Sequence, residues 1–235
     1  MGVLYIVATP IGNLEDITVR ALRVLREVDL VLCEDTRVTR TLLGAHGISA
    51  RVMSYHSHSG RAKAEKVLAA LSDGKSVALV SDAGTPTISD PGSSLVALVR
   101  ERLPEAPVVP VPGASAVVAA LSASGLPSSE FLFLGFLPRK KGRRAIFSEI
   151  TESKRTVVFY ESPHRVIKTL ESLAGAFSEA GQEGRRVAVA REITKIHEEF
   201  VSGTPREILA HYEKHRDRVR GEFVVMVEGA SRRSE

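Results

Sequence analysis

The chain has 235 residues, of which 43% are hydrophobic and 26% are charged, and its formal net charge is +4. No apolar run of roughly 18 residues occurs and Cys33 is the only cysteine, so neither a membrane span nor a disulfide or thiolate metal cluster within the chain is supported. We expect a globular cytosolic protein without a signal peptide, whose weak positive charge permits a polyanionic partner without requiring one.

Short apolar runs alternate with segments of helical periodicity in the first half of the chain, a pattern typical of an α/β fold with a mainly parallel sheet. Helices are expected over residues 19–28 and from about Thr36 and Arg61. A further helix is expected to begin at Pro91, with Asp90 as its N-cap. The predicted strands of this half are residues 4–8, 30–33, 77–80 and 108–111.

A domain boundary is expected at residues 110–113, PVPG, which stiffen and then turn the chain. It gives an N-terminal α/β domain of residues 1–112 and a C-terminal α/β domain of residues 113–235. In the second of these, residues 198–202 follow Arg191 too closely for a helical crossover, which predicts an antiparallel pair within a mixed sheet.

Two proline pairs mark helix starts in the second half. Ser162-Pro163 and Thr204-Pro205 each resemble an N-cap followed by proline at the first helical position, and Thr204 with Glu207 fits a capping box. The predicted strands of this half are residues 131–136, 157–160, 187–190 and 223–227.

A glycine-containing loop, SDAGTPTISDPG at residues 81–92, directly follows a predicted strand. Taken alone, it is better explained as an ordinary turn-rich loop, and no dinucleotide, P-loop, zinc-protease or serine-hydrolase motif accompanies it. Similar loops follow other predicted strands at residues 8–17, 33–37 and 111–115. Because carboxyl ends of parallel strands meet at one edge of a sheet, where open α/β folds bind ligands, we expect the four loops to form the rim of a pocket.

The same loops, together with FLGFLP, FYESPHR, REITK and GEFVVMVEG farther along, carry a family resemblance that spans nearly the whole chain. The chain resembles the tetrapyrrole-methylase superfamily of S-adenosylmethionine-dependent methyltransferases. Within it, the chain is most similar to the branch that methylates the ribose 2′-oxygen of ribosomal RNA. The resemblance implies two α/β domains of the class III methyltransferase type, a methyl donor bound in the cleft between them, and a homodimer.

A sulfonium cation with an amino-acid head and an adenosine needs oxygen ligands, helix N–H groups and an apolar slot. Asp82, Ser115 and Ile88 offer one of each, and Ala83 and Gly84 allow backbone to approach closely. By position in the family's motifs, the expected cofactor-binding residues are Pro10, Ser81, Asp82, Ala83, Gly84, Ile88, Ser115, Ala116, Tyr160, Gly221, Glu222 and Phe223.

Glu161 and Lys195 are the expected catalytic residues, because a ribose hydroxyl is a poor nucleophile that needs alignment and a group to remove or share its proton. Lys195 can serve as a base only if burial lowers its pKa, and otherwise serves as an electrostatic clamp. An ordinary buried ion pair at each motif is an equally good explanation of either residue taken singly.

Five cations lie within six positions directly after residues 136–138 and predict an RNA-binding segment. A solvated helix start is the alternative explanation of such a charge run. The expected RNA-binding residues are Arg37, Arg139, Lys140, Lys141, Arg143 and Arg144, and Arg216, Arg218 and Arg220 repeat the theme more weakly.

No metal site is expected. His56 and His58 lie on one side of an extended segment, and His211 and His215 are one helical turn apart, but neither pair has an evident third ligand.

The function expected from the resemblance is methylation of the ribose 2′-oxygen of a cytidine in the decoding region of 16S ribosomal RNA, with S-adenosylmethionine as cofactor and the small ribosomal subunit as partner. Since RNA has a 2′-hydroxyl and DNA lacks it, DNA is an implausible acceptor. Two alternatives stay open: a methylase of the same superfamily that acts on a porphyrinoid or a protein, and a noncatalytic RNA-binding scaffold.

Overall fold

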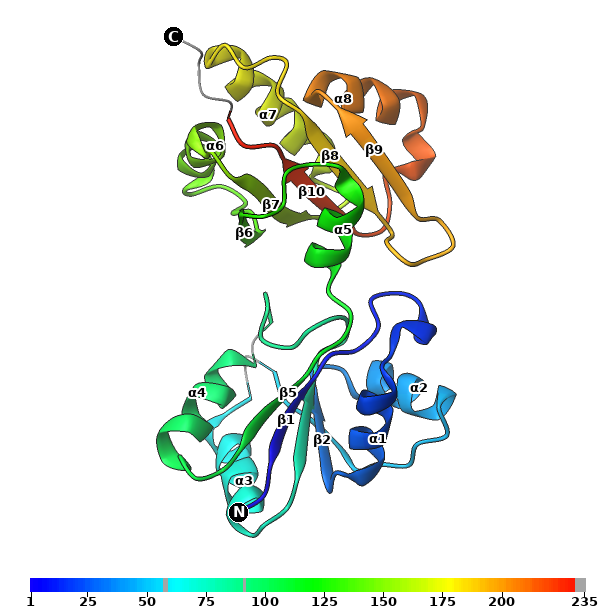
Figure 1. The fold of residues 1–235 in the computed structure, drawn as a ribbon, viewed down its shortest axis with the longest axis vertical. Helices are drawn as coiled ribbons and strands as arrows, with labels where there is room; N and C mark the ends of the chain where they lie inside the picture. Colours follow the sequence, from blue (N-terminus) through cyan, green and yellow to red (C-terminus); the bar gives the residue numbers. More distant parts are fainter. Residues whose placement is uncertain (57–58, 91, 231–235) are drawn as a thin grey trace. The chain divides into compact units, whose positions relative to one another are not determined.

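The computed structural model describes residues 1–56, 59–90 and 92–230, and its elements are drawn in Figure 1. The chain forms two compact units, one from Met1 to Ser115 and one from Ala116 onward. In the described part of the chain, no helix combines the length and the apolar character that a membrane crossing requires.

The first unit is built on a parallel sheet with the strand order β3-β2-β4-β1-β5. Since every strand points the same way, the loops that follow the strands emerge at one edge. The elements are β1 Leu4–Val7, η1 Leu14–Asp16, α1 Val19–Glu27, β2 Leu30–Cys33, α2 Thr36–Ala45, β3 Val52–Ser54, α3 Arg61–Ser72, β4 Val77–Val80, α4 Ser93–Arg102 and β5 Val108–Val111.

Helices cover both faces of this sheet, with α3 and α4 on one side and α1 and α2 on the other (Figure 1). Strand β4 shows why its sequence is continuously apolar: Val77 and Leu79 pack toward α3 and α4, whereas Ala78 and Val80 pack toward α1 and α2. The α/β fold predicted for this half, with its parallel sheet, is confirmed.

The predicted start of α4 is wrong. The helix begins at Ser93 with Gly92 as its N-cap, and the Asp90 carboxylate accepts the Gly92 N–H at 3.0 Å. Asp90 therefore caps the turn that precedes the helix instead of the helix itself. Pro91 lies outside the described residues.

The second unit has a mixed sheet with the order β6-β7-β10-β8-β9, in which β6 is parallel to β7 and the other pairs are antiparallel. The predicted mixed sheet and the antiparallel β8–β9 pair are confirmed. The elements are α5 Ala116–Ser124, β6 Phe131–Phe136, α6 Arg143–Glu152, β7 Thr156–Glu161, α7 Val166–Glu179, β8 Val187–Arg191, β9 Glu199–Gly203, α8 Pro205–Lys214, η2 Arg216–Arg218 and β10 Phe223–Val227.

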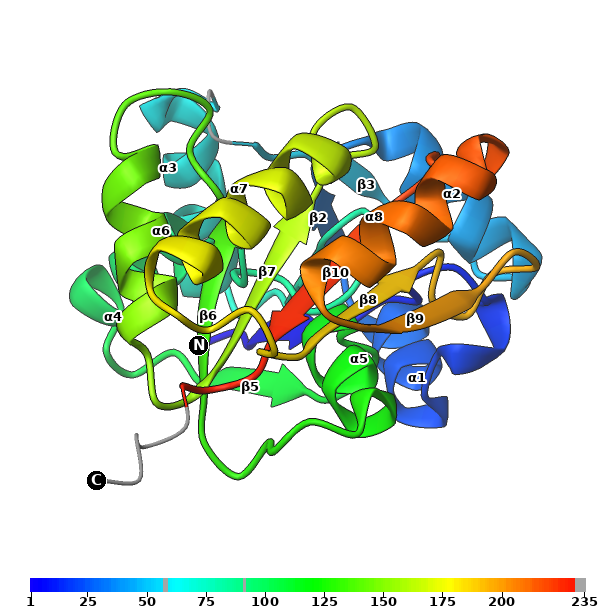
Figure 2. The same cartoon turned by 90° about the horizontal axis from the view of Figure 1, so that it is seen from above.

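The core of this unit lies between its sheet and helices α6, α7 and α8, and α5 packs against β8 and β10 (Figure 2). Helix α8 has the predicted capping box between Thr204 and Glu207. Helix α7 begins at Val166, four residues after Ser162, so the predicted start is wrong. The Ser162 carbonyl accepts the N–H groups of Arg165 and Val166, which makes residues 163–165 a turn that leads into the helix.

Candidate active site

Hydrogen bonds join the predicted rim loops at the carboxyl edge of the first sheet. Thr9 and Gly84 exchange both backbone hydrogen bonds, at 3.0 and 3.1 Å. The Thr9 hydroxyl donates to the Ser81 carbonyl at 3.1 Å, and the Thr85 hydroxyl donates to the Ala114 carbonyl at 3.1 Å. The loops that follow β1, β4 and β5 are therefore tied into one rim.

The loop after β4 holds an unusual backbone conformation. Gly84 has a φ of 81°, and a Cβ there would lie 3.3 Å from Ile11. Thr87 and Ser89 have φ values of 75° and 57°, which non-glycine residues rarely adopt. Such conformations cost free energy and persist where surrounding contacts enforce them, as at ligand sites.

Carboxylates gather at the same edge. Asp82 Oδ1 accepts the N–H of Asp35 at 3.0 Å, which joins the loop after β4 to the start of α2. Burial raises the pKa of Glu34, and the charges of Asp90 and Asp82 raise it further. Burial also raises the pKa of Asp90, with a contribution from Asp82. Mutually repelling carboxylates produce a negative potential that favours a cationic ligand.

The other predicted residues of the first unit lie along this rim. Pro10 and Ser81 are buried, and the Ser81 hydroxyl donates to the Gly84 carbonyl at 3.0 Å. Ala83 and Ile88 are exposed, as Asp82 is, and Ser115 is half-buried beyond the end of β5.

Arg37, predicted to bind RNA, is paired within its own helix start. Its Nη2 lies 2.6 Å from Asp35 Oδ2, and its hydrogen bonds lower the pKa of Asp35 to about 2. The guanidinium remains exposed, but a carboxylate already balances its charge. The pairing does not support a phosphate contact.

In the second unit, Lys195 is held between two carboxylates. Its Nζ lies 2.8 Å from Glu192 Oε1 and 2.8 Å from Glu222 Oε2. Burial alone would lower the pKa of Lys195, but the hydrogen bonds that it donates to the two carboxylates outweigh burial and raise the pKa. Lys195 is therefore an ammonium ion at neutral pH and not a base, and the two carboxylates already balance its charge.

The backbone around Lys195 has unusual conformations and packs closely against the turn at Gly221. Glu192 and Thr194 have φ values of 52° and 67°. Gly221 has a φ of 84°, and a Cβ there would collide with the Glu192 side chain. The Glu222 N–H donates to Glu192 Oε1 at 2.9 Å, so the motifs GEFVVMVEG and REITK are in contact.

Glu161, the other predicted catalytic residue, is enclosed. Its side chain is 0% exposed, and its carboxylate accepts the Ser162 N–H at 2.8 Å, Arg165 Nη2 at 2.6 Å and the Thr169 hydroxyl at 2.7 Å. A carboxylate that accepts three hydrogen bonds and has no exposed surface is not accessible to a substrate proton in this structure. The geometry therefore favours a positioning role for Glu161 over the predicted catalytic one.

Aromatic rings surround the end of β7. The Tyr160 ring lies 5.1 Å from the Phe133 ring and 5.4 Å from the Phe136 ring, and burial, with the charge of Glu222, raises the pKa of Tyr160. Phe136 is 60% exposed at the end of β6. Phe223, one of the expected cofactor-binding residues, is only 2% exposed, and its side chain belongs to the core.

The basic run at residues 139–144 begins before helix α6 and continues into its first turn. Gly142 turns the chain with a φ of 82°, and no acidic residue is present in that first turn. Arg143 donates to the Thr169 hydroxyl at 2.9 Å and lies over the Phe147 ring. The remaining cations are exposed and have no side-chain partner in the described part of the chain: Arg139, Lys140, Lys141 and Arg144.

Metal ligands do not converge within residues 1–56, 59–90 and 92–230, where no group of three His, Cys, Asp or Glu side chains could hold an ion. His211 Nε2 lies 3.1 Å from Glu199 Oε1, and its ring lies 4.7 Å from that of His215. His58 lies outside the described residues.

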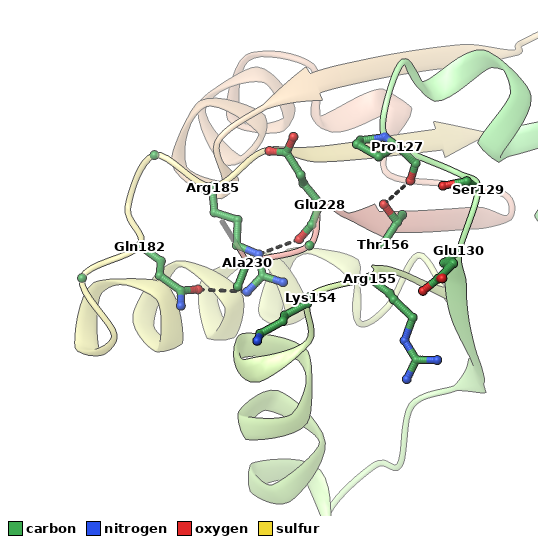
Figure 3. A pocket seen from close by; sticks show the side chains of 13 residues that line it. Pro127, Ser129, Glu130, Lys154, Arg155, Thr156, Gln182, Arg185, Glu228 and Ala230 are labelled. Atoms are coloured by element: carbon green, nitrogen blue, oxygen red, sulfur yellow. Dashed lines mark hydrogen bonds between the residues drawn. The ribbon is translucent and has the colours of Figure 1, made fainter. Parts of the chain in front are cut away.

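A cavity of about 620 Å³ lies at the opposite end of the second sheet, near the start of β7 and the end of β10 (Figure 3). None of the predicted site residues lines it. The buried Arg185 in its wall donates to the carbonyls of Ile150, Thr151, Ser153 and Glu228, and to the Gln182 side chain. These contacts occupy its N–H groups and cap the end of α6, so Arg185 is a structural residue.

Residues 3–209 match the family of tetrapyrrole (corrin/porphyrin) methylases. The chain belongs to this family. It is 49% identical to ribosomal RNA small subunit methyltransferase I of Escherichia coli O157:H7 over 97% of this chain and 78% of that protein. Identity to the protein of the same name from Thermotoga maritima is 44%, over 97% of this chain and 99% of that protein.

The fold agrees with the family. The structure of uroporphyrin-III C-methyl transferase from Thermus thermophilus complexed with S-adenyl homocysteine has a TM-score of 0.63 and 18% identity, covering 97% of both chains. The family resemblance, the class III fold and the methyltransferase class expected from the motifs are confirmed.

Sequence reasoning missed three residues of the second unit: Arg165 and Thr169, which surround Glu161, and Glu192, which holds Lys195. The spacing of Glu161 and Arg165, four residues apart, could have indicated their ion pair. Thr169 lies in an ordinary amphipathic helix, and nothing in the sequence distinguishes its hydroxyl.

Proposed function

We propose that this chain transfers the methyl group of S-adenosylmethionine to the ribose 2′-oxygen of a cytidine in the decoding region of 16S ribosomal RNA. The names of its close relatives, small-subunit ribosomal RNA methyltransferases, support the acceptor. The observation that carries the donor is the carboxylate-lined rim of the first unit, because a sulfonium ion is a cation and a rim of oxygen atoms stabilises it.

The rim also fits the shape of a nucleoside donor. A Cβ at Gly113 would lie 2.9 Å from the Ala8 Cβ, so the turn after β5 approaches β1 as closely as backbone allows. Backbone N–H and carbonyl groups at these turns can bind the amino-acid head and the adenosine, and Asp82 can face the sulfonium. The related protein that binds S-adenyl homocysteine has the same fold.

The donor supplies an electrophilic methyl group, and the chain's own residues bind and orient the reactants. In the second unit, the Lys195 ammonium is fixed between Glu192 and Glu222 and holds the loop after β8 to the turn before β10. The cations of the basic run at the start of α6 can bind RNA phosphates together with the helix N–H groups.

Replacement of Asp82 by Asn tests the donor site. Asn keeps an oxygen that can accept the Asp35 N–H but removes the charge, so we expect donor affinity to fall by about tenfold in calorimetry while the fold is retained. Asp73→Asn, at the exposed C-cap of α3, is the matched control and should bind the donor normally. Equal affinity in both variants would contradict the assignment of Asp82, and no donor binding by the wild type would leave only a scaffold.

We also propose a cytoplasmic homodimer. Strand β6 is an edge strand of its sheet, and Phe131 and Phe136 on it are 40% and 60% exposed, which is typical of a surface that pairs. Sedimentation equilibrium should give twice the chain mass of 25.4 kDa, and a mass of 25.4 kDa would contradict the dimer.

A further inference from the structure

A buried chain of hydrogen bonds connects Glu161 to the basic run. Glu161 Oε2 accepts the Thr169 hydroxyl at 2.7 Å, and the Thr169 oxygen accepts Arg143 Nη2 at 2.9 Å. Glu161 Oε1 accepts Arg165 Nη2 at 2.6 Å. We call Glu161, Thr169, Arg143 and Arg165 the anchor network; it joins the end of β7 and the helices α7 and α6.

Both arginines of the anchor network also hold the backbone that leads into the basic run. Arg165 Nη1 donates to the Leu137 carbonyl at 2.9 Å, and Arg143 Nη1 reaches the Pro138 carbonyl at 3.5 Å. The segment is therefore fixed at residues 137–138 and again at Arg143, on either side of its exposed cations.

Burial makes these contacts strong. Thr169 and the Glu161 side chain are 0% exposed, and the Arg165 side chain is 22% exposed. A buried carboxylate without its donors would be costly, so Arg165 and Thr169 are held to it, and Thr169 in turn accepts Arg143. Arg143 is accordingly directed into the unit, which distinguishes it from Arg139, Lys140, Lys141 and Arg144.

We propose that Arg143 is a positioning residue and not a phosphate ligand: through Thr169 and Glu161 it fixes the basic run, so that the four other cations form a preorganised site for RNA phosphates. This inference rests on the proposed function. A segment that is already ordered loses less conformational entropy when RNA binds, so the network increases RNA affinity without touching RNA.

Arg143→Met and Arg144→Met form a matched pair, since each removes one positive charge from the start of the same helix. For Arg144→Met we expect a small loss of RNA affinity and a salt slope reduced by about 0.7–0.9, the value of one phosphate contact. For Arg143→Met we expect RNA affinity to fall by about tenfold, with faster trypsin cleavage after Arg139, Lys140 and Lys141. Identical RNA affinity, salt slope and cleavage rate in the two variants would overturn the proposal.

Thr169→Val and Thr169→Ser test the network without any change of charge. The valine removes the hydroxyl and keeps the shape, so RNA affinity should fall by about tenfold and cleavage of the run should accelerate, with donor affinity unchanged. The serine keeps the hydroxyl and should behave as wild type. Thermal unfolding verifies that both variants are folded.

The outcomes separate the two proposals. If folded Thr169→Val binds a 16S ribosomal RNA fragment as tightly as wild type, the proposed role of the anchor network is overturned and the proposed function is not. Absence of RNA binding by the wild-type protein would contradict the proposed function and the proposed phosphate site. The trypsin comparison would still report whether Thr169 fixes the basic run.

Discussion

Glu34 and its acidic neighbours at the rim of the first unit lower the stability of the fold and produce a negative potential there. Burial raises the pKa of Glu34, and the charges of Asp90 and Asp82 raise it further. A carboxyl with a raised native pKa binds protons more readily in the folded than in the unfolded state, so stability decreases as pH rises through its titration range. The charged Glu34 carboxylate therefore lowers the free energy of unfolding at neutral pH.

Glu34→Gln should relieve that cost. We expect the variant to be more stable than wild type at pH 7, by less than about 1 kcal/mol, with the gain disappearing below roughly pH 4, where Glu34 is protonated in both states. Urea unfolding at several pH values measures it. Glu105→Gln, at an exposed site of the same unit, should show no such dependence. A variant that is less stable than wild type at pH 7 would show that Glu34 is stabilised and not strained.

At the residue scale, the sequence predicted where the rim loops emerge but not how Glu161 is enclosed. Asp82 and Gly84 lie where the motif placed them, because a parallel sheet fixes where its loops emerge. Glu161 was predicted to be catalytic from the same kind of motif, yet its carboxylate is enclosed by Arg165 and Thr169. Arg165 lies within the motif, as the alternative of a buried ion pair allowed, but Thr169 lies beyond it in α7, so the motif does not reveal its contact.

The connection before β10 is an element whose shape depends on one glycine. Gly221 has a φ of 84° and faces the Glu192 side chain, which in turn holds Lys195. A methyl group at Gly221 would both strain the backbone and displace Glu192. The turn before β10 and the loop after β8 are therefore one structural element.

Gly221→Ala should lower the free energy of unfolding by about 1–3 kcal/mol and reduce methyl transfer, since the Lys195 ammonium loses its support. Gly175→Ala is the matched control: this glycine lies within α7, and a Cβ there meets nothing within 4 Å. It should raise the free energy of unfolding by about 0.5–1 kcal/mol. Chemical denaturation compares them, and equal stability of the two variants would contradict the account of Gly221.

Among the three helix starts predicted from an N-cap followed by proline, the one with a complete capping signal is confirmed and the other two are wrong. Thr204 and Glu207 form a reciprocal box, and α8 begins directly after Thr204, as the sequence predicts. Ser162 has no such partner, so a turn intervenes before α7 begins at Val166. Hydrogen bonds of the Asp90 side chain likewise shifted the start of α4.

For the whole molecule, the alternation of apolar runs and helical segments was sufficient to predict two α/β halves with a parallel and a mixed sheet, since strand pairing follows from connection length. The family followed from motifs spread along the chain. The anchor network could not be predicted, because it joins residues 143, 161, 165 and 169 through side chains that only the folded unit brings together.

The most direct test of the account is to incubate the protein with S-adenosylmethionine and small ribosomal subunits that lack ribose methylation, and to map alkaline cleavage of the 16S ribosomal RNA. Cleavage by alkali requires a free 2′-hydroxyl, so we predict that one cytidine in the decoding region becomes resistant, and that Asp82→Asn slows this change. A cleavage pattern identical with and without the protein, at saturating donor, would contradict the proposed reaction.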